Sequence, residues 1–248
     1  MSADVPAIIE EKYLVTSADT DFTRRLKVSA LVNMLIQIAW HHAEILGFGI
    51  EFLHRNGLAW MLSRMHLKMG PLPSWNEEII ITSWPKGINR LFYLRDMQVK
   101  DHSGKKLADV TTEWLMIDTK SKRPKLYDPE NNIFRQNLQR HAIAEFVPVL
   151  KADREGNEKF EFTVHYSDID LNQHLTTTRY VDWMFDTLDT AFLSKNQCAE
   201  LVLNFLKEIP GKQKVIVSRP LTGSTSDLNF EFSDGSGAHI YFRGLVVF

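Results

Sequence analysis

The chain has 248 residues, of which 44% are hydrophobic and 24% are charged, and its formal net charge is -2. This composition is that of an ordinary globular protein, and the lack of a basic surplus argues against a nucleic-acid partner. The single cysteine, Cys198, excludes an intramolecular disulfide and a cysteine-held metal cluster, and it favours a cytoplasmic location. The first residues lack the pattern of a secretion signal, and no apolar stretch approaches the roughly 20 residues of a membrane span. We therefore expect no membrane span.

An amphipathic helix is predicted for residues 28–46. The side chains of its buried face recur at intervals of three and four residues, at Val28, Leu31, Val32, Leu35, Ala39, His42, Ile45 and Leu46. Two glycines, Gly47 and Gly49, end this helix. Segments rich in β-branched and aromatic residues follow, separated by proline, glycine and serine. They predict four successive antiparallel strands at 58–69, 78–85, 90–100 and 106–118.

The same order of elements is predicted a second time. A helix is expected at 176–192, and strands are expected near 200–206, 213–220, 227–233 and 238–248. Identical residues recur at a constant spacing of 149 positions: Asp21 with Asp170, Leu26 with Leu175 and Val32 with Val181. Identities at one spacing, combined with a repeated order of elements, indicate a duplicated unit.

A helix wrapped by a curled antiparallel sheet buries both the apolar helix and the alternating strands within each copy. The predicted fold is therefore α+β, a double hotdog in which two tandem single-helix units form a pseudo-dimer. The predicted domains are an N-terminal unit at 1–127, a linker at 128–158 that is long enough to hold a short helix, and a C-terminal unit at 159–248.

The two copies differ in the turn before the helix. The second copy has Asp170, Asn172 and His174 there, whereas the first copy keeps only the aspartate, Asp21. A helix start stabilises developing negative charge, and histidine can orient or deprotonate a water near neutral pH. Aspartate and asparagine are also common helix caps, so the local residues alone leave a purely structural role open. The loss of the other two side chains from the first copy favours a catalytic role in the second.

The segments 167–174 and 180–183 resemble the catalytic motif of the acyl-acyl carrier protein thioesterases, enzymes of plant plastids and some bacteria that end fatty acid synthesis. Segments 57–65, 73–77 and 203–208 are also similar to landmarks of that family. The resemblance runs from about residue 10 to the end of the chain. Its D-x-N-x-H element at a helix entry is the specific part, and each flanking match is weak by itself.

The resemblance implies a double-hotdog hydrolase whose first domain shapes an acyl tunnel and whose second domain carries catalysis. It assigns the catalytic residues Asp170, Asn172, His174 and Glu208, with no cofactor and no metal. Plant members have a cysteine directly after the glutamate, but this chain has Ile209. Water activated by His174 and Glu208 is therefore the expected nucleophile. The implied partner is acyl carrier protein carrying a fatty acyl chain, with the chain acting as a monomer or a homodimer.

Two larger sets of residues are candidates for binding. Flexible thioethers and flat rings suit an alkyl tunnel, and ordinary core packing is their alternative; these are Met34, Met61, Met65, Met69, Met184, Trp60 and Trp84. Basic side chains suit an acidic carrier protein, and plain solvation is their alternative; these are Arg24, Arg25, Lys27, Lys122, Arg123, Lys125, Arg135 and Arg140. An acyl-CoA thioesterase, an acyl-thioester dehydratase or hydratase, and a non-catalytic acyl-chain binding protein stay open as alternative functions.

Overall fold

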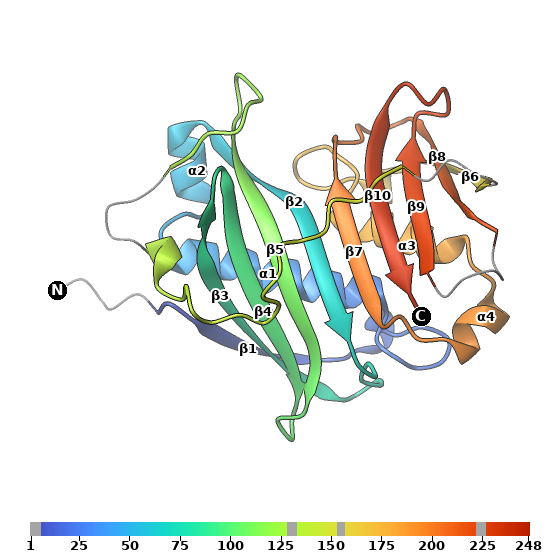
Figure 1. Ribbon diagram of the computed structural model, residues 1–248, viewed down its shortest axis with the longest axis horizontal. Coiled ribbons are helices and arrows are strands. Elements are labelled where there is room, and N and C mark those ends of the chain that lie inside the picture. Colours follow the sequence, from blue (N-terminus) through green and yellow to red (C-terminus); the bar gives the residue numbers. More distant parts are fainter. Residues whose placement is uncertain (1–5, 128–132, 153–156, 222–226) are drawn as a thin grey trace. The chain divides into compact units, whose positions relative to one another are not determined.

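The computed structural model describes residues 6–127, 133–152, 157–221 and 227–248. Contacts divide the chain into two compact units. The first comprises Met1–Leu26 and Met34–Val147, and the second comprises Lys27–Asn33 and Pro148–Phe248. Each unit contains an antiparallel sheet and a few helices, which confirms the predicted α+β tandem hotdog (Figure 1). Among the described residues, no helix combines the length and the apolar character needed to cross a membrane.

The first unit contains a five-stranded sheet with the order β1-β3-β4-β5-β2, in which all neighbouring strands are antiparallel. Its elements are β1 (Ile9–Leu14), the 3₁₀ helix η1 (Ser17–Asp19), the greater part of α1 (Val28–Ile45), α2 (Ile50–Asn56), β2 (Leu58–Met69), β3 (Glu78–Asn89), β4 (Phe92–Asp101), β5 (Lys106–Asp118) and the 3₁₀ helix η2 (Ile133–Arg135). The bounds of β2 and β5 are those predicted from the sequence. The seven-residue α2 was not predicted, because so short a segment shows no helical period.

Helix α1 crosses one face of the first sheet (Figure 1). Leu35 and Ile38 on this helix are fully buried, and the exposed fraction of Ala39 is 5%. They lie on one helical stripe at positions i, i+3 and i+4; Leu35 and Ala39 were predicted on this stripe, whereas Ile38 was not. Burying an aliphatic side chain of this size stabilises a fold by roughly 1.5–3 kcal/mol, so this stripe fixes how α1 lies on its sheet.

The second unit repeats the topology of the first. Its elements are β6 (Asn157–Thr163), the 3₁₀ helix η3 (Tyr166–Asp168), α3 (Thr177–Asp186), α4 (Thr190–Lys195), β7 (Glu200–Phe205), β8 (Lys214–Pro220), β9 (Asp227–Ser233) and β10 (Ile240–Val247). Read from β6, the strand order is β6-β8-β9-β10-β7, which matches β1-β3-β4-β5-β2 element for element. The predicted duplication is therefore visible in the topology of the two sheets.

Helix α3 packs closely on the second sheet. The ring of Tyr180 lies 5.0 Å from that of Phe242 on β10. Met184, one turn further along α3, is fully buried, and a Cβ atom on Gly244 of β10 would lie 2.3 Å from its sulfur atom. Glycine at position 244 thus permits the close approach of α3 to β10.

The predicted helix at 176–192 is wrong in one respect, because the structure has two helices there. Helix α3 ends where the Thr187 hydroxyl donates to the Met184 carbonyl (2.8 Å) and the buried Arg219 guanidinium donates to the Thr187 carbonyl (2.9 Å). Helix α4 then starts at its own N-cap, Asp189, whose carboxylate accepts from the Ala191 amide. The capping signal of Asp189 overrides the apolar period that runs through this segment.

The described part of the predicted linker, residues 133–152, contains η2 and then lies against buried charges of the first sheet. Lys86 on β3 and Asp96 on β4 form an ion pair of 2.9 Å. The Lys86 ammonium donates to the Ile143 carbonyl, and the Asp96 carboxylate accepts from the Ala142 amide, both at 2.7 Å. These bonds fasten the segment around residue 143 to the first unit. Residues 128–132 and 153–156 of the predicted linker lie outside the described residues.

Candidate active site

The candidate active site lies in the turn that joins η3 to α3 in the second unit. Asp168 anchors the turn: its carbonyl accepts from the Thr176 amide (2.8 Å), and its buried carboxylate pairs with Arg179 on α3 (2.9 Å). An antiparallel bridge between Ile169 and Leu175 closes the base of the turn. The helix start and the turn are thereby held as one rigid piece.

Asp170 organises the backbone inside this turn. Its Oδ1 atom accepts from the amides of Asn172 (2.8 Å) and His174 (3.2 Å), while its own amide donates to the His174 carbonyl (2.9 Å). Gln173 adopts the left-handed conformation, with φ at 68°, and its amide donates to the Asp170 carbonyl (3.0 Å). One carboxylate therefore fixes the direction of the two residues that carry the other predicted side chains.

His174 and Glu208 meet across the turn. The Leu175 amide donates to the Ile209 carbonyl (2.9 Å), and His174 bridges to Pro210, so the segment after β7 runs alongside the turn. The His174 Nε2 atom lies 3.1 Å from Glu208 Oε2. The exposed fractions of these side chains are 29% and 52%, so water reaches both of them. Asn172 lies on the same turn, with an exposed side chain.

This arrangement has the parts needed to activate a water molecule. With Nε2–H donated to Glu208, the neutral imidazole leaves its Nδ1 lone pair as an acceptor. An ion pair this exposed contributes only about 0–1 kcal/mol to stability, so the contact between His174 and Glu208 does little to stabilise the fold. The first turn of a helix generally has amides without intrahelical partners, and such amides favour negative charge near the turn before α3.

Tyr180 belongs to the site but was not predicted as a functional residue. Its exposed fraction is 4%, and it has a backbone hydrogen bond with Ile209. Burial raises the pKa of the Tyr180 hydroxyl above its usual range, and the charges of Glu208 and Asp170 raise it further. The sequence had placed this residue only within segment 180–183 of the family motif and had given it no role, although the phenol supports the segment that presents Glu208.

A cysteine nucleophile has no place in this site. Ile209, at the position after Glu208, is fully buried. Cys198 is also buried, and its thiol donates to the Glu200 carbonyl. Burial raises the pKa of the Cys198 thiol to about 12, so it is not a thiolate at neutral pH. Cys198 is therefore a small residue of the core.

Of the predicted tunnel residues, Trp60 lines a pocket of the first unit, between α1 and the sheet. Trp84 is engaged elsewhere: its indole N–H donates to the Arg140 carbonyl, and the Arg140 guanidinium stacks 4.2 Å from the centre of its ring. Met34, Met65, Met69 and Met184 are buried, and Met61 is half-buried. In the described part of the chain, no group of three or more His, Cys, Asp or Glu side chains is arranged to hold a metal ion.

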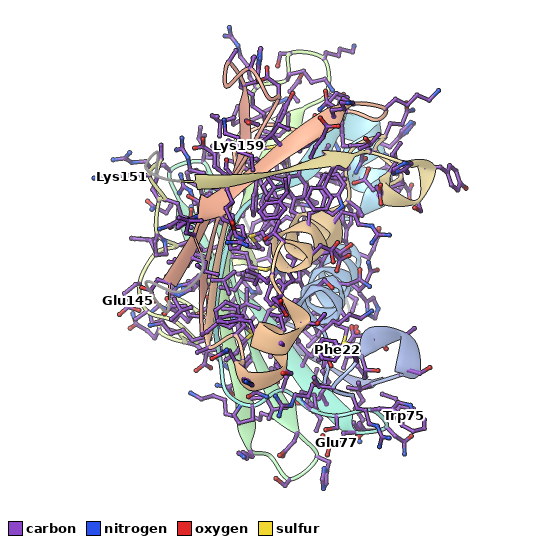
Figure 2. The ribbon with its side chains drawn as sticks, turned by 90° about the vertical axis from the view of Figure 1, so that its right-hand side faces the viewer. Phe22, Trp75, Glu77, Glu145, Lys151 and Lys159 are labelled. Atoms are coloured by element: carbon purple, nitrogen blue, oxygen red, sulfur yellow. The ribbon has the colours of Figure 1, made fainter. Side chains whose placement is uncertain are left out.

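Most of the basic residues suggested for carrier docking lie at the surface; Arg24, Lys27, Lys122, Arg123, Lys125 and Arg140 are exposed, and Arg25 and Arg135 are half-buried. Figure 2 shows two aromatic side chains, Phe22 and Trp75, at the surface of the first unit near its own pre-helix turn, with exposed fractions of 60% and 57%.

Comparisons with known proteins show the family of the chain. Residues 6–131 match the model of the acyl-ACP thioesterase N-terminal domain, and residues 151–240 match that of the C-terminal domain. The chain is 23% identical to oleoyl-acyl carrier protein thioesterase 1 of Arabidopsis thaliana, a chloroplast protein, over 93% of this chain and 68% of that protein. It is 22% identical to a chloroplast acyl-[acyl-carrier-protein] hydrolase of Cuphea viscosissima, over 80% of this chain and 51% of that protein. The chain thus spans about half to two thirds of the curated plant relatives that it matches.

Solved structures share the fold. An acyl-ACP thioesterase from Bacteroides thetaiotaomicron superposes with a TM-score of 0.81 at 24% identity, covering 97% of both chains. The 12:0-ACP thioesterase from Umbellularia californica superposes with a TM-score of 0.83 at 18% identity, covering 97% of this chain and 93% of that one. Since the two family models together match most of the sequence, the chain belongs to the acyl-ACP thioesterase family.

Proposed function

We propose that this protein hydrolyses the thioester of fatty acyl-acyl carrier protein, which releases a free fatty acid and ends chain elongation. The observation that carries the proposal is the 3.1 Å contact between His174 and Glu208 at a turn organised by Asp170. Membership in a family of thioester hydrolases supports the same activity. The names of the plant relatives supply the carrier protein as the thiol carrier.

The proposed mechanism is a direct attack by water. The Asn172 amide group and an amide at the start of α3 hold the thioester carbonyl, and they stabilise the negative charge that develops on its oxygen. His174, paired with Glu208, takes a proton from water as the water oxygen bonds to the carbonyl carbon. The tetrahedral adduct then breaks its C–S bond, and the carrier leaves as a thiol that receives the proton. Asp170 holds the turn in place throughout.

The division of labour between the two units is part of the proposal. The N-terminal domain, taken as 1–127, binds the acyl chain, and the C-terminal domain, taken as 159–248, carries catalysis, with 128–158 as the linker. The apolar pocket around Trp60 in the first unit supports the first assignment. The His174–Glu208 pair in the second unit supports the other. The cytoplasmic location and the monomeric or homodimeric state stay predictions.

The test is thiol release from a panel of saturated acyl thioesters of increasing length, on acyl carrier protein and on coenzyme A. Native protein is compared with His174→Gln and Glu208→Gln, two changes that keep the size of the side chain. We expect release from carrier-protein thioesters, and a fall of about 10²–10⁴-fold in kcat for each variant because a positioned acid–base group is lost. Equal thermal midpoints would show that both variants stay folded.

Three other outcomes would redirect the assignment. Release from coenzyme A thioesters only would move the substrate to acyl-CoA. Conversion of the acyl chain without thiol release would indicate a dehydratase or hydratase. Binding of acyl carrier protein with no turnover at any chain length would contradict hydrolysis and leave a binding protein.

A further inference from the structure

The pocket of the first unit lies on the face of the sheet that α1 crosses. It contains about 440 Å³ of empty space, its open mouth included. Aromatic rings form much of its wall, among them Trp40, Trp60, Tyr93, Trp114 and Phe134. Rings of this kind suit an alkyl chain, and an enclosing wall of them excludes water.

One residue in this wall is charged. Arg95, on β4, lines the pocket and has an exposed fraction of 7%. Its Nη1 atom donates to His42 Nδ1 on α1 (2.8 Å) and to Ser83 Oγ on β3 (2.9 Å). His42 is neutral, because burial and the neighbouring guanidinium lower its pKa to about 4, and its Nε2 atom bonds to the Pro6 carbonyl. Both partners of Arg95 are therefore uncharged.

The Arg95 guanidinium has N–H groups that the bonds to His42 and Ser83 do not use. Arginine presents five N–H groups, and the bonds to His42 and Ser83 occupy the two on Nη1. In the part of the chain that the structure describes, no carboxylate pairs with Arg95, and its Nε and Nη2 atoms have no hydrogen-bond partner. A buried cation without a counter-charge is costly, and buried polar groups in proteins are nearly always bonded. An apolar pocket needs no such group to hold a plain alkyl chain.

We propose that Arg95 is a specificity residue that selects acyl chains bearing an oxygen acceptor, a hydroxyl or keto group, at the depth of the pocket where its guanidinium lies. The inference rests on the proposed function, because it takes the occupant of the pocket to be the acyl chain of the substrate. An oxygen atom on the chain satisfies the spare N–H groups of Arg95, whereas a methylene group at the same depth leaves them unpaired.

The competing explanation is that Arg95 only ties α1 to the sheet through His42 and Ser83. An anchoring role predicts that replacing Arg95 weakens hydrolysis of all acyl chains alike. A specificity role predicts that the replacement changes the ratio between oxygenated and plain chains. The ratio is measured within one variant, so any general loss of folded or active protein cancels from it.

The experiment places a hydroxyl group at each successive carbon of the chain. The chain length is the saturated one that is hydrolysed fastest, and each hydroxyacyl-acyl carrier protein isomer competes against its plain counterpart. With native protein we expect one isomer, or two adjacent ones, to exceed the plain chain in kcat/KM by about 10–100-fold, the value of a hydrogen bond to a charged donor. Arg95→Met, which has a similar length and no donors, should remove this preference.

Control variants separate the two roles. Ser83→Ala and His42→Gln disturb the anchoring bonds but leave the guanidinium in the pocket, so the preferred isomer should remain preferred. If Arg95→Met fails to fold, Arg95→Lys keeps the charge with fewer and differently placed donors, and it should reduce the preference. A plain chain that is preferred to every isomer by native protein, or a ratio that is the same in native protein and in the Arg95 variant, would overturn the proposal.

The inference stays testable if no thioester is hydrolysed. Because Trp40, Trp60 and Trp114 line the pocket, tryptophan fluorescence reports a ligand in it. The probes are then the methyl esters of the same plain and hydroxylated acids, which carry no carboxylate of their own. Tighter binding of one hydroxy isomer that is lost in Arg95→Met would support the selection of oxygenated chains even though the hydrolase proposal had failed. Equal binding of all esters would overturn it.

Discussion

The turns before α1 and α3 share a backbone conformation but carry chemically different side chains. In both turns an aspartate amide donates to the carbonyl four residues later, at 2.8 Å for Asp21 and 2.9 Å for Asp170. Both have a left-handed residue three positions after the aspartate, with φ at 66° for Arg24 and 68° for Gln173. A short 3₁₀ helix with a capping box precedes each turn. The shape of the turn is therefore specified by the aspartate and by the bonds that its carboxylate accepts.

The side chains that this shape presents differ completely. The first copy has Thr23 and Arg25 where the second has Asn172 and His174. The amides of the residues after Arg25 and His174 donate to the carbonyls of Pro73 and Ile209, respectively, at 2.8 and 2.9 Å. Leu72 therefore occupies the position in the first copy that is equivalent to Glu208 in the second. In the duplicated turn, the aspartate specifies the backbone conformation, and the residues two and four positions later specify the chemistry. The first turn therefore serves as a matched control for the second in mutagenesis.

The largest expected effect comes from exchanging the residues at one pair of equivalent positions. We expect His174→Arg to lower kcat for thiol release by about 10²–10⁴-fold, because the imidazole that takes the proton is lost. Arg25→His, the reverse change in the first copy, should alter kcat by less than about threefold, since Leu72 occupies the position equivalent to Glu208 there. Steady-state kinetics of both variants measure the contrast. A similar loss in both would mean that the two turns are not functionally distinct.

A second contrast concerns acid stability, because the first unit holds a fully buried histidine and the histidines of the second unit are exposed or half-buried. Burial lowers the pKa of His42 from 6.5 to about 4. The unfolded chain then binds a proton before the folded one does, so stability is full above pH 6.5 and falls as the pH drops towards 4. The loss over this window is about 3 kcal/mol.

Urea unfolding near pH 6.5 and near pH 4, followed by tryptophan emission, measures this loss. Five of the six tryptophans lie in the first unit, so the emission mainly reports that unit. Burial raises the pKa of Asp96, which acts in the opposite direction, so the comparison is between native protein and His42→Gln. His42→Gln should lose less stability over this pH window than native protein does. Equal losses would show that His42 is not the group that titrates.

A third prediction concerns the aspartates that shape the two turns. Replacing either Asp21 or Asp170 by alanine should lower the free energy of unfolding by about 1–3 kcal/mol, the usual value of bonds to a charged acceptor. Asp21 also accepts from the hydroxyl of Thr23 (2.7 Å), so its loss should be the larger of the two. Only Asp170→Ala should also lower kcat. If Asp21→Ala lowered kcat as much as Asp170→Ala, the assignment of catalysis to the second turn would be wrong.

The sequence predicted the features whose signals are local. Strand β2 lies between Gly57 and Gly70, strand β5 is rich in β-branched and aromatic residues, and the limits of both were predicted correctly. The residues of the turn at 170–174 were identified as candidate catalytic residues because the equivalent turn of the first copy lacks two of their side chains. His174 and Glu208 then proved to be in contact, as the family resemblance had implied.

What the sequence did not predict depends on partners that are distant along the chain. The break between α3 and α4 is held by Arg219, which lies 32 residues after Thr187. The pairing of Arg95 with His42 joins residues 53 positions apart, and the helical period had indicated only a core position for this histidine. Long-range polar contacts of this kind leave no periodic signal, because each needs a single residue on each side.

The smallest effects should come from the left-handed residue of each turn. A non-glycine residue in this conformation is strained by about 1–2 kcal/mol, and glycine relieves the strain but adds freedom to the unfolded chain. Gln173→Gly and Arg24→Gly should therefore change the free energy of unfolding by less than about 1 kcal/mol, and by similar amounts. Gln173→Val and Arg24→Val should each destabilise by about 1–2 kcal/mol, because a β-branched residue resists a positive φ. Urea unfolding of the four variants measures this, and unequal effects at positions 24 and 173 would show that the two backbones are less alike than their hydrogen bonds indicate.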